Sequence, residues 1–203
     1  MIKTGVPFRL IIGILFAHLL MYFSFNNMTI FWYIFAGSIL LLIMYTMSQE
    51  KVDDEVPFFS YFSLGILSGI ILYVIFWLFN KGINFFNLPF SQNIYQLYHN
   101  YAPSLFWEYL ALIFVAAPGE ELFWRGYIQK QLLKNFQPTS AIILGALLYA
   151  SAQIYSGQFI LVFATFICGI VWGSLYHWKK SMPVVIVSHI LFDILLFIFL
   201  PLR

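Results

Sequence analysis

The chain has 203 residues, of which 62% are hydrophobic, 21% aromatic and 9% charged, and its mean hydropathy is +0.88. A soluble domain is roughly 25% charged, so this composition excludes an ordinary soluble protein and predicts a polytopic integral membrane protein. The formal net charge of +2 is too small to indicate a nucleic-acid partner. The single cysteine, Cys168, cannot form an intrachain disulfide, and its apolar surroundings indicate a small packing residue.

Seven segments approach the roughly 20 apolar residues that a spanning helix needs, which predicts an all-α transmembrane bundle of about seven spans. The predicted spans are residues 7–25, 29–47, 58–80, 104–124, 138–154, 158–178 and 183–202. Lys3 and Arg9 precede the apolar run from Leu10 to Phe25, but no small-residue cleavage site follows that run, so we interpret it as a retained first span. Segment 81–103 is expected to be an interfacial helix or loop, and the charged segment 49–55 a solvated connection.

The basic residues predict the orientation, because cytoplasmic loops carry an excess of lysine and arginine. With a cytoplasmic N-terminus, Lys81 and Arg203 fall on the opposite, non-cytoplasmic side of the membrane. The others fall on or near the cytoplasmic side: Lys3, Arg9, Lys51, Arg125, Lys130, Lys134, Lys179 and Lys180. The glutamate end of the fourth span is then expected near the cytoplasmic leaflet.

Two adjacent glutamates, Glu120 and Glu121, lie in this fourth span. A carboxylate at bilayer depth costs at least roughly 2.5 kcal/mol and is a functional-site hypothesis by default. Glu121 and Arg125 are four residues apart, so they share a helix face and are predicted to form an ion pair. Glu120 points about 100° away on an ideal helix, which allows it a different environment and a role as a base. The alternative is an ion pair that only locks helices together.

Two further segments carry polar groups in apolar surroundings. His189 and Asp193 are four apart in the last span, so they share a face. Gln153 ends the fifth span beside Tyr149-Ala150-Ser151-Ala152, and it cannot act as a general base. His18 is expected to be a packed or interfacial residue.

Together these segments resemble the type II CAAX prenyl endopeptidase and bacteriocin-processing family of membrane proteins, also called the Abi family. That family carries EExxxR, FxxxH and HxxxN or HxxxD on successive helices. The first motif is present as Glu120-Glu121-Leu122-Phe123-Trp124-Arg125, and the third runs from His189 to Asp193. In the second motif, Tyr149 replaces phenylalanine and Gln153 replaces histidine.

The resemblance implies an intramembrane endopeptidase with catalytic residues Glu120, His189, Asp193 and Gln153. Glu120 would be the general base, Gln153 would position a water, and His189 with Asp193 would stabilise the oxyanion. Glu121 and Arg125 would form a structural ion pair. Residues 104–203 would form the catalytic core, and residues 1–103 the N-terminal transmembrane helices with the interfacial segment.

Three functions stay open at this point. The first is peptide-bond hydrolysis near the cytoplasmic face, with a peptide or small protein as substrate. The second is a catalytically weak or inactive relative that acts as a membrane regulatory, binding or immunity protein, because Gln153 replaces the histidine. The third is a small transporter with a glutamate relay. We expect no cofactor and no catalytic metal, and an integral protein of a bacterial plasma membrane; the sequence leaves the substrate and the oligomeric state open.

Two structural expectations follow. The last four spans should enclose a polar cavity lined by Glu120, Glu121, Gln153, His189 and Asp193. The pairs Gly65 with Gly69 and Gly169 with Gly173 should mark close helix contacts, because small residues let backbones approach in lipid.

Overall fold

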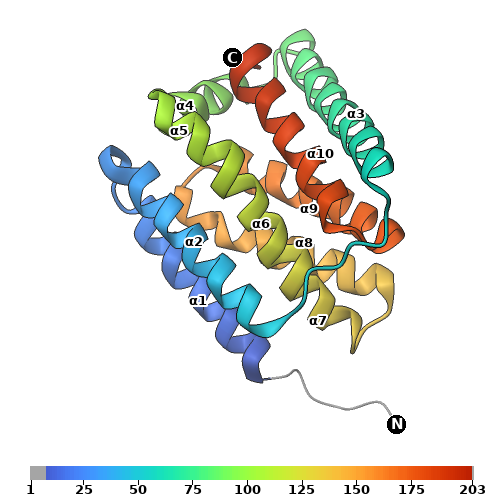
Figure 1. The fold of residues 1–203 in the computed structure, drawn as a ribbon. Coiled ribbons are helices and arrows are strands. Elements are labelled where there is room, and N and C mark those ends of the chain that lie inside the picture. The colour runs from blue at the N-terminus through green and yellow to red at the C-terminus, as the bar shows by residue number, and fades with distance from the viewer. Residues whose placement is uncertain (1–7, 203) are drawn as a thin grey trace.

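A computed structural model describes residues 8–202, which form a bundle of helices (Figure 1). Lys3 and Arg203, which the orientation prediction used, lie outside this described part. The α-helices are α1 (Phe8–Phe25), α2 (Phe31–Gln49), α3 (Phe58–Phe85), α4 (Ser91–Tyr101), α5 (Phe106–Ala111), α6 (Ala117–Phe123), α7 (Lys130–Leu133), α8 (Pro138–Ala152), α9 (Phe159–Lys179) and α10 (Met182–Ile194). Short 3₁₀ turns occupy Met28–Ile30 and Ile154–Ser156, and π-helical turns occupy Leu112–Ala116, Trp124–Gln129 and Leu195–Phe199. The predicted all-α class is confirmed.

Six helices in the described range are long and apolar enough to cross a membrane. They are Phe8–Phe25, Met28–Gln49, Phe58–Phe85, Pro138–Ser156, Phe159–Lys179 and Met182–Phe199. A seventh crossing is formed if α4 and the helix Phe106–Leu133, which meet at a bend of 103°, count as one span. The structure thus agrees with about seven predicted spans, and it turns part of segment 81–103 into helices.

The predicted fourth span, 104–124, is extended in the structure to Leu133 through α5, α6 and α7. Its polar continuation stays helical because Arg125 and Gln129 are buried against neighbouring helices, with 1% and 2% of their surface exposed. Loss of apolar character therefore does not end this helix, since the polar side chains face protein rather than lipid.

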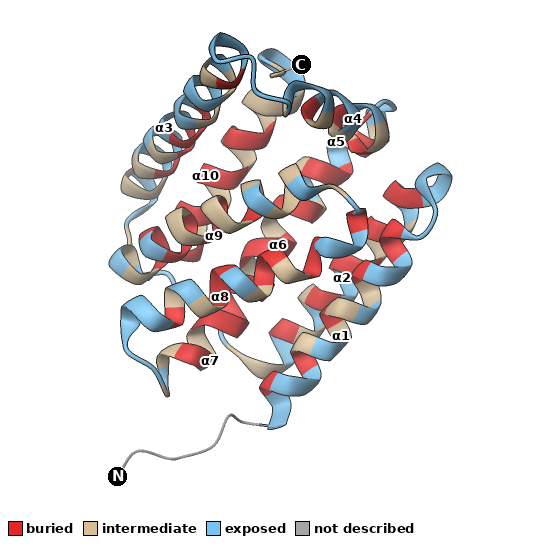
Figure 2. Cartoon of the chain, turned by 180° about the vertical axis from the view of Figure 1, so that it is seen from behind, coloured by how far each residue is buried: buried red, intermediate tan, exposed pale blue. Residues whose placement is uncertain are grey.

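The long helix containing α6 crosses the middle of the bundle, with α1 and α2 on one flank and α3 beside α10 on the other (Figure 1). Buried positions face inward, whereas α3 is exposed along most of its outer surface (Figure 2). Exposed side chains on α3 include Phe59, Leu67 and Leu78. A lipid-facing surface of this kind explains why the chain is so apolar throughout.

The four glycines lie at close helix contacts, as predicted. A Cβ atom on Gly69 would lie 2.7 Å from the Ser188 carbonyl oxygen, and one on Gly65 the same distance from Val187. These contacts bring α3 against α10. Gly169 packs equally tightly against Ala146, which joins α9 to α8. Gly173 on α9 meets Gln129 of the central helix, and the Gln129 amide donates a hydrogen bond of 2.8 Å to the Gly173 carbonyl.

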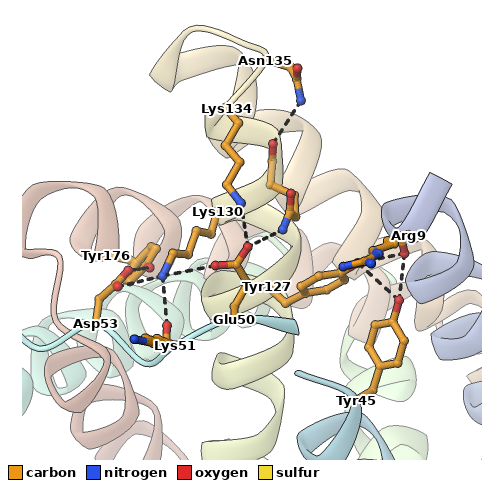
Figure 3. A network of polar contacts seen from close by, with 11 residues as sticks. Arg9, Tyr45, Glu50, Lys51, Asp53, Tyr127, Lys130, Lys134, Asn135 and Tyr176 are labelled. Carbon is orange, nitrogen blue, oxygen red and sulfur yellow. Dashed lines mark hydrogen bonds and ion pairs between the residues drawn. The ribbon is translucent and has the colours of Figure 1, made fainter. Parts of the chain in front are cut away.

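The segment between α2 and α3 is tied to the rest of the bundle by charged contacts (Figure 3). Lys130 lies 2.7 Å from Asp53, and Lys134 lies 2.6 Å from Glu50. The Tyr176 hydroxyl donates to Asp53 as well. Partial burial tends to raise the pKa of Asp53, but the hydrogen bonds from Lys130 and Tyr176 and the charge of Lys130 outweigh it and hold this pKa below its usual value. The predicted solvated connection is therefore a paired strap across one end of the bundle.

Candidate active site

The helix that carries the glutamate pair is locally irregular. Pro118 lacks an N–H, so the carbonyl one turn earlier loses its usual donor, and the preceding turn, Leu112–Ala116, is π-helical. A second π-helical turn, Trp124–Gln129, follows the pair. Such turns occur frequently at functional sites. Gly119 brings this helix against Ile39 of α2 at a separation that leaves no room for a side chain.

Glu121 is fully buried and links two helices through one oxygen. Its Oε1 atom lies 3.0 Å from Arg125 Nη1 and 2.8 Å from His189 Nδ1. An ionised carboxylate only accepts hydrogen bonds, so His189 Nδ1 carries the proton in this contact. The expected pairing with Arg125 thus has a third member, and Glu121 sets the orientation of the His189 ring.

Arg125 is enclosed by aromatic rings. Its guanidinium carbon lies 4.7 Å from the centre of the Tyr149 ring and 5.4 Å from that of Trp172. It also donates to the Cys168 carbonyl over 3.4 Å. Buried charges need partners of this kind, so Arg125 joins the π-helical turn Trp124–Gln129 to α8 and α9.

Glu120 faces away from this ion pair and towards α8 and α10. Its exposed fraction is 8%. The Tyr149 hydroxyl donates to Glu120 Oε2 over 2.6 Å, and His189 Nε2 lies 3.9 Å from the same oxygen. Glu120 Oε1 has no hydrogen bond from any of the described residues. One carboxylate oxygen is therefore held by protein and the other is available.

His189 sits between the glutamates and Asp193. Its Nε2 atom lies 3.5 Å from Asp193 Oδ2, and its ring stacks on Trp172 with centroids 3.9 Å apart. The Trp172 indole N–H donates to Ser188 Oγ over 3.1 Å, which fixes the indole against the helix that carries His189. Contacts at Nδ1 and on the ring face hold His189 in one orientation, with Nε2 directed towards Glu120 and Asp193.

One cavity of about 160 Å³ brings together the side chains predicted to be catalytic. Glu120, Gln153, His189 and Asp193 all line it. Gln153 follows the last residue of α8 and is 4% exposed. The apolar part of the wall also includes side chains from the first two helices: Phe25, Phe31, Trp32 and Phe35.

Two expectations about the cavity need correction. Glu121 does not line it, because its carboxylate is turned to Arg125 and His189. The last four spans do not enclose it alone, because α1 and α2 supply an aromatic wall. Both differences arise from helix packing, which the position of a residue along its own helix does not determine.

A second, apolar pocket of about 200 Å³ adjoins this cavity between α3, α4, α9 and the π-helical turn Leu195–Phe199. Its two polar residues are Asn80 and Tyr98, and both are engaged: the Asn80 amide donates to the Leu202 carbonyl, and the Tyr98 hydroxyl to that of Leu196. The residues that line both spaces are Phe76, Leu97, Ala164, Leu196 and Phe197. The rest of the pocket wall is apolar.

The donor set does not fit a metal centre. No three His, Cys, Asp or Glu side chains within residues 8–202 are grouped so that they could hold a metal ion. A catalytic zinc site usually uses three protein ligands, yet Glu121 is engaged with Arg125 and the Tyr149 hydroxyl occupies Glu120 Oε2.

Two residues of the site, Tyr149 and Trp172, were not predicted from the sequence to take part in it. The sequence indicates Tyr149 only as the replacement of phenylalanine in the second motif, and the sequence analysis assigns no role to Trp172. The four-residue spacing of Tyr149 and Gln153 could have placed the hydroxyl on the same face as the amide. No pattern in the sequence indicates the stacking of Trp172 on His189.

Comparison with known proteins bears on this geometry. The family model described as Type II CAAX prenyl endopeptidase Rce1-like matches residues 102–195, a range that includes all three motifs. No curated protein and no solved structure matches the chain. Over residues 102–195, the range that holds the glutamate pair, Gln153, His189 and Asp193, the chain is similar to the Rce1-like type II CAAX prenyl endopeptidases.

Proposed function

We propose that this protein is an intramembrane endopeptidase in which Glu120 activates a water for attack on a peptide bond. The observation that carries the proposal is the convergence of Glu120, Gln153, His189 and Asp193 on one cavity. The family match supports a CAAX-type membrane protease in general. The catalytic roles of individual residues are our inference.

The reaction needs one base and one site for developing negative charge. Glu120 Oε1 takes a proton from water, and the resulting hydroxide attacks the carbonyl carbon of the peptide bond. The tetrahedral intermediate then collapses, the carbon–nitrogen bond breaks, and Glu120 returns the proton to the leaving amine. Assistance by a positioned base is worth about 10²–10⁴ in rate.

His189 is the candidate for stabilising the oxyanion. Its Nδ1–H is engaged by Glu121, so its Nε2 can donate to an oxyanion only when the ring carries both protons. The carboxyl groups of Glu121 and Asp193 lie within 2.8 and 3.5 Å of the ring nitrogens and supply the counter-charge for that form. Gln153, which lines the same cavity, would hold the water without taking its proton.

We infer that residues 104–203 act as the catalytic core and that residues 1–103 supply supporting helices. The aromatic wall from α1 and α2 supports this division. We also propose cleavage near the cytoplasmic face of a bacterial plasma membrane. Arg9, Lys51, Lys130 and Lys134 gather at the same end of the bundle (Figure 3), which agrees with the excess of basic residues found on cytoplasmic sides.

The test compares purified parent protein with Glu120→Gln in lipid nanodiscs, using a library of membrane-associated peptides and mass spectrometry of the products. Glu108→Gln is the matched control. Glu108 is also a carboxylate on this long helix and is 8% exposed, but its Oε2 caps the helix start by accepting from Ser104 and Leu105. We expect cleavage by the parent and by Glu108→Gln, and none by a folded Glu120→Gln. Equal cleavage by Glu120→Gln would refute the proposal.

The alternative is a family member that binds a membrane peptide without cleaving it. The specific observation in its favour is Gln153, because the second-motif histidine is absent and an amide cannot accept the proton. Peptide binding that survives in both parent and Glu120→Gln, with no cleavage in either, would establish this function instead.

A further inference from the structure

Tyr149 is buried at the centre of the candidate site, and its ring is held by two neighbours. It is 4% exposed, it lies against Trp124 with ring centroids 5.2 Å apart, and the Arg125 guanidinium covers its face at 4.7 Å. These contacts leave the hydroxyl a single direction. It ends 2.6 Å from Glu120 Oε2, inside the cavity.

A buried tyrosine hydroxyl usually finds some partner, so the hydrogen bond alone does not define a role. The identity of the partner does. The acceptor is the carboxylate that faces the cavity, and the bond leaves Oε1 of that carboxylate free of hydrogen bonds from the described residues. Hydrogen bonds to an ionised acceptor are about twice as strong as neutral ones, so this contact can fix the rotation of the carboxylate.

The second motif differs from the family pattern at two positions, and both changes meet at this cavity. Gln153 stands where the pattern has histidine, and Tyr149, four residues earlier on the same helix face, stands where it has phenylalanine. Both residues line the cavity with Glu120. The chain has thus lost a titratable group at one position and gained a hydrogen-bond donor at the other.

We propose that Tyr149 is a positioning residue for Glu120. By orienting the Glu120 carboxylate, it compensates for part of the water activation that the missing histidine would supply as a base. The hydroxyl holds Oε2 and leaves Oε1 to face the attacking water in the cavity that Gln153 also lines. Tyr149 keeps its proton throughout: Oε1 alone takes the proton from water and delivers it to the leaving nitrogen. This inference rests on the proposed function.

Tyr149→Phe tests it, because phenylalanine keeps the contacts with Trp124 and Arg125 and removes only the hydroxyl. Tyr73→Phe is the matched control: Tyr73 is 6% exposed, and its hydroxyl donates over 2.8 Å to the Leu200 carbonyl, away from both cavities. With a peptide cleaved by the parent, Tyr149→Phe should lower kcat about tenfold or more, since misplaced catalytic groups cost up to about 10² in rate. KM should stay within about twofold, because the group acts in the reaction rather than in binding.

Two further measurements separate positioning from packing. Adding Gln153→His to Tyr149→Phe recreates the family pattern and should recover part of the lost kcat. The infrared carboxyl band that Glu120→Gln removes should shift in Tyr149→Phe and stay unchanged in Tyr73→Phe.

The outcomes distinguish the two proposals. Cleavage that is abolished by Glu120→Gln but unchanged in Tyr149→Phe would overturn the role of Tyr149 and leave the proposed function standing. An equal loss of kcat in Tyr73→Phe, or no recovery on adding Gln153→His, would reduce Tyr149 to a packing residue and overturn the inference. A parent that cleaves no peptide would overturn both.

Discussion

Glu121 on α6 binds the Nδ1 atom of His189 on α10 across 2.8 Å, between residues 68 positions apart in the chain. The same oxygen of Glu121 binds Arg125, while its Oε2 has no hydrogen-bond partner in the described structure. The ion pair and the candidate oxyanion site are therefore one unit. Removing Glu121 or Arg125 leaves the charge of the other in an apolar interior without its partner.

Arg125→Ala should lower both the folded yield in membranes and the thermal stability. The change leaves the buried Glu121 carboxylate without its cation, and breaking a buried pair in this way costs about 3–5 kcal/mol. Thermal unfolding of the purified protein in detergent measures the effect. Lys134→Ala is the control, because Lys134 also pairs with a glutamate but its side chain is 53% exposed, and exposed pairs contribute about 0–1 kcal/mol. Equal stability of Arg125→Ala and the parent would contradict a structural role.

Gly69→Ala should destabilise the contact between α3 and α10. The added Cβ would lie 2.7 Å from the Ser188 carbonyl oxygen and 3.2 Å from Leu191, and overpacking of this kind costs about 1–3 kcal/mol. Gly82→Ala on the same helix meets no atom within 4 Å, so it should be neutral or slightly stabilising, since alanine is the better helix former. Both variants can be compared by thermal unfolding, and a Gly69→Ala protein as stable as Gly82→Ala would show that the contact adjusts freely.

The spans and the pairing of residues four positions apart could be predicted because both depend on local pattern. Apolar length identifies a spanning helix, and a spacing of four residues places Glu121 with Arg125 and His189 with Asp193. The bend of 103° between α4 and the following helix could not be predicted, because it depends on how two helices pack. The family resemblance, rather than spacing, suggested that the three motifs share a site.

Contacts between residues on different helices could not be predicted from the sequence either, because they also depend on how the helices pack. Glu121 was assigned to Arg125 from their spacing, and its bond to His189 needs the crossing of α6 and α10. Trp172 stacks on His189 because α9 and α10 pack together. Asp53 looked like a solvated charge in a loop, yet Lys130 and Tyr176 from two other elements converge on it.

Asp53 should give the protein an acid-sensitive component of stability. Its pKa in the folded protein lies below the usual value, so its pairing stabilises the fold at pH values above the unfolded pKa. That contribution is lost as the pH falls through the lower, folded pKa. Thermal unfolding of the parent and Asp53→Asn should differ at neutral pH, by about 1 kcal/mol or less for a partly exposed pair, and converge in acid.

Asp54→Asn is the neighbouring control for this measurement. Asp54 accepts from the Ser181 hydroxyl and forms no ion pair with a lysine in the described structure, so the difference from the parent should be smaller. A gap between parent and Asp53→Asn that persists unchanged into acid would show that the charge of Asp53 is not what stabilises the strap.

Ala164→Phe should impair the cleavage of peptides that carry a large apolar residue beside the cleaved bond. Ala164 on α9 lies in the wall shared by the polar cavity and the apolar pocket. A phenylalanine there would fill space on both sides, and overpacking in a closed site is costly. The apolar pocket is the natural place for such a residue, since its two polar residues are already hydrogen-bonded.

The expected result is a rise in KM for peptides with a large apolar residue and a smaller change for peptides with alanine at the same position. Leu147→Phe provides the control, because Leu147 is 49% exposed on the outer surface of α8 and lines neither space. Steady-state kinetics with the two peptide sets separate the cases. An increase in KM that is equal for both sets would show general damage to the site, and unchanged kinetics for both would show that the substrate never enters the apolar pocket.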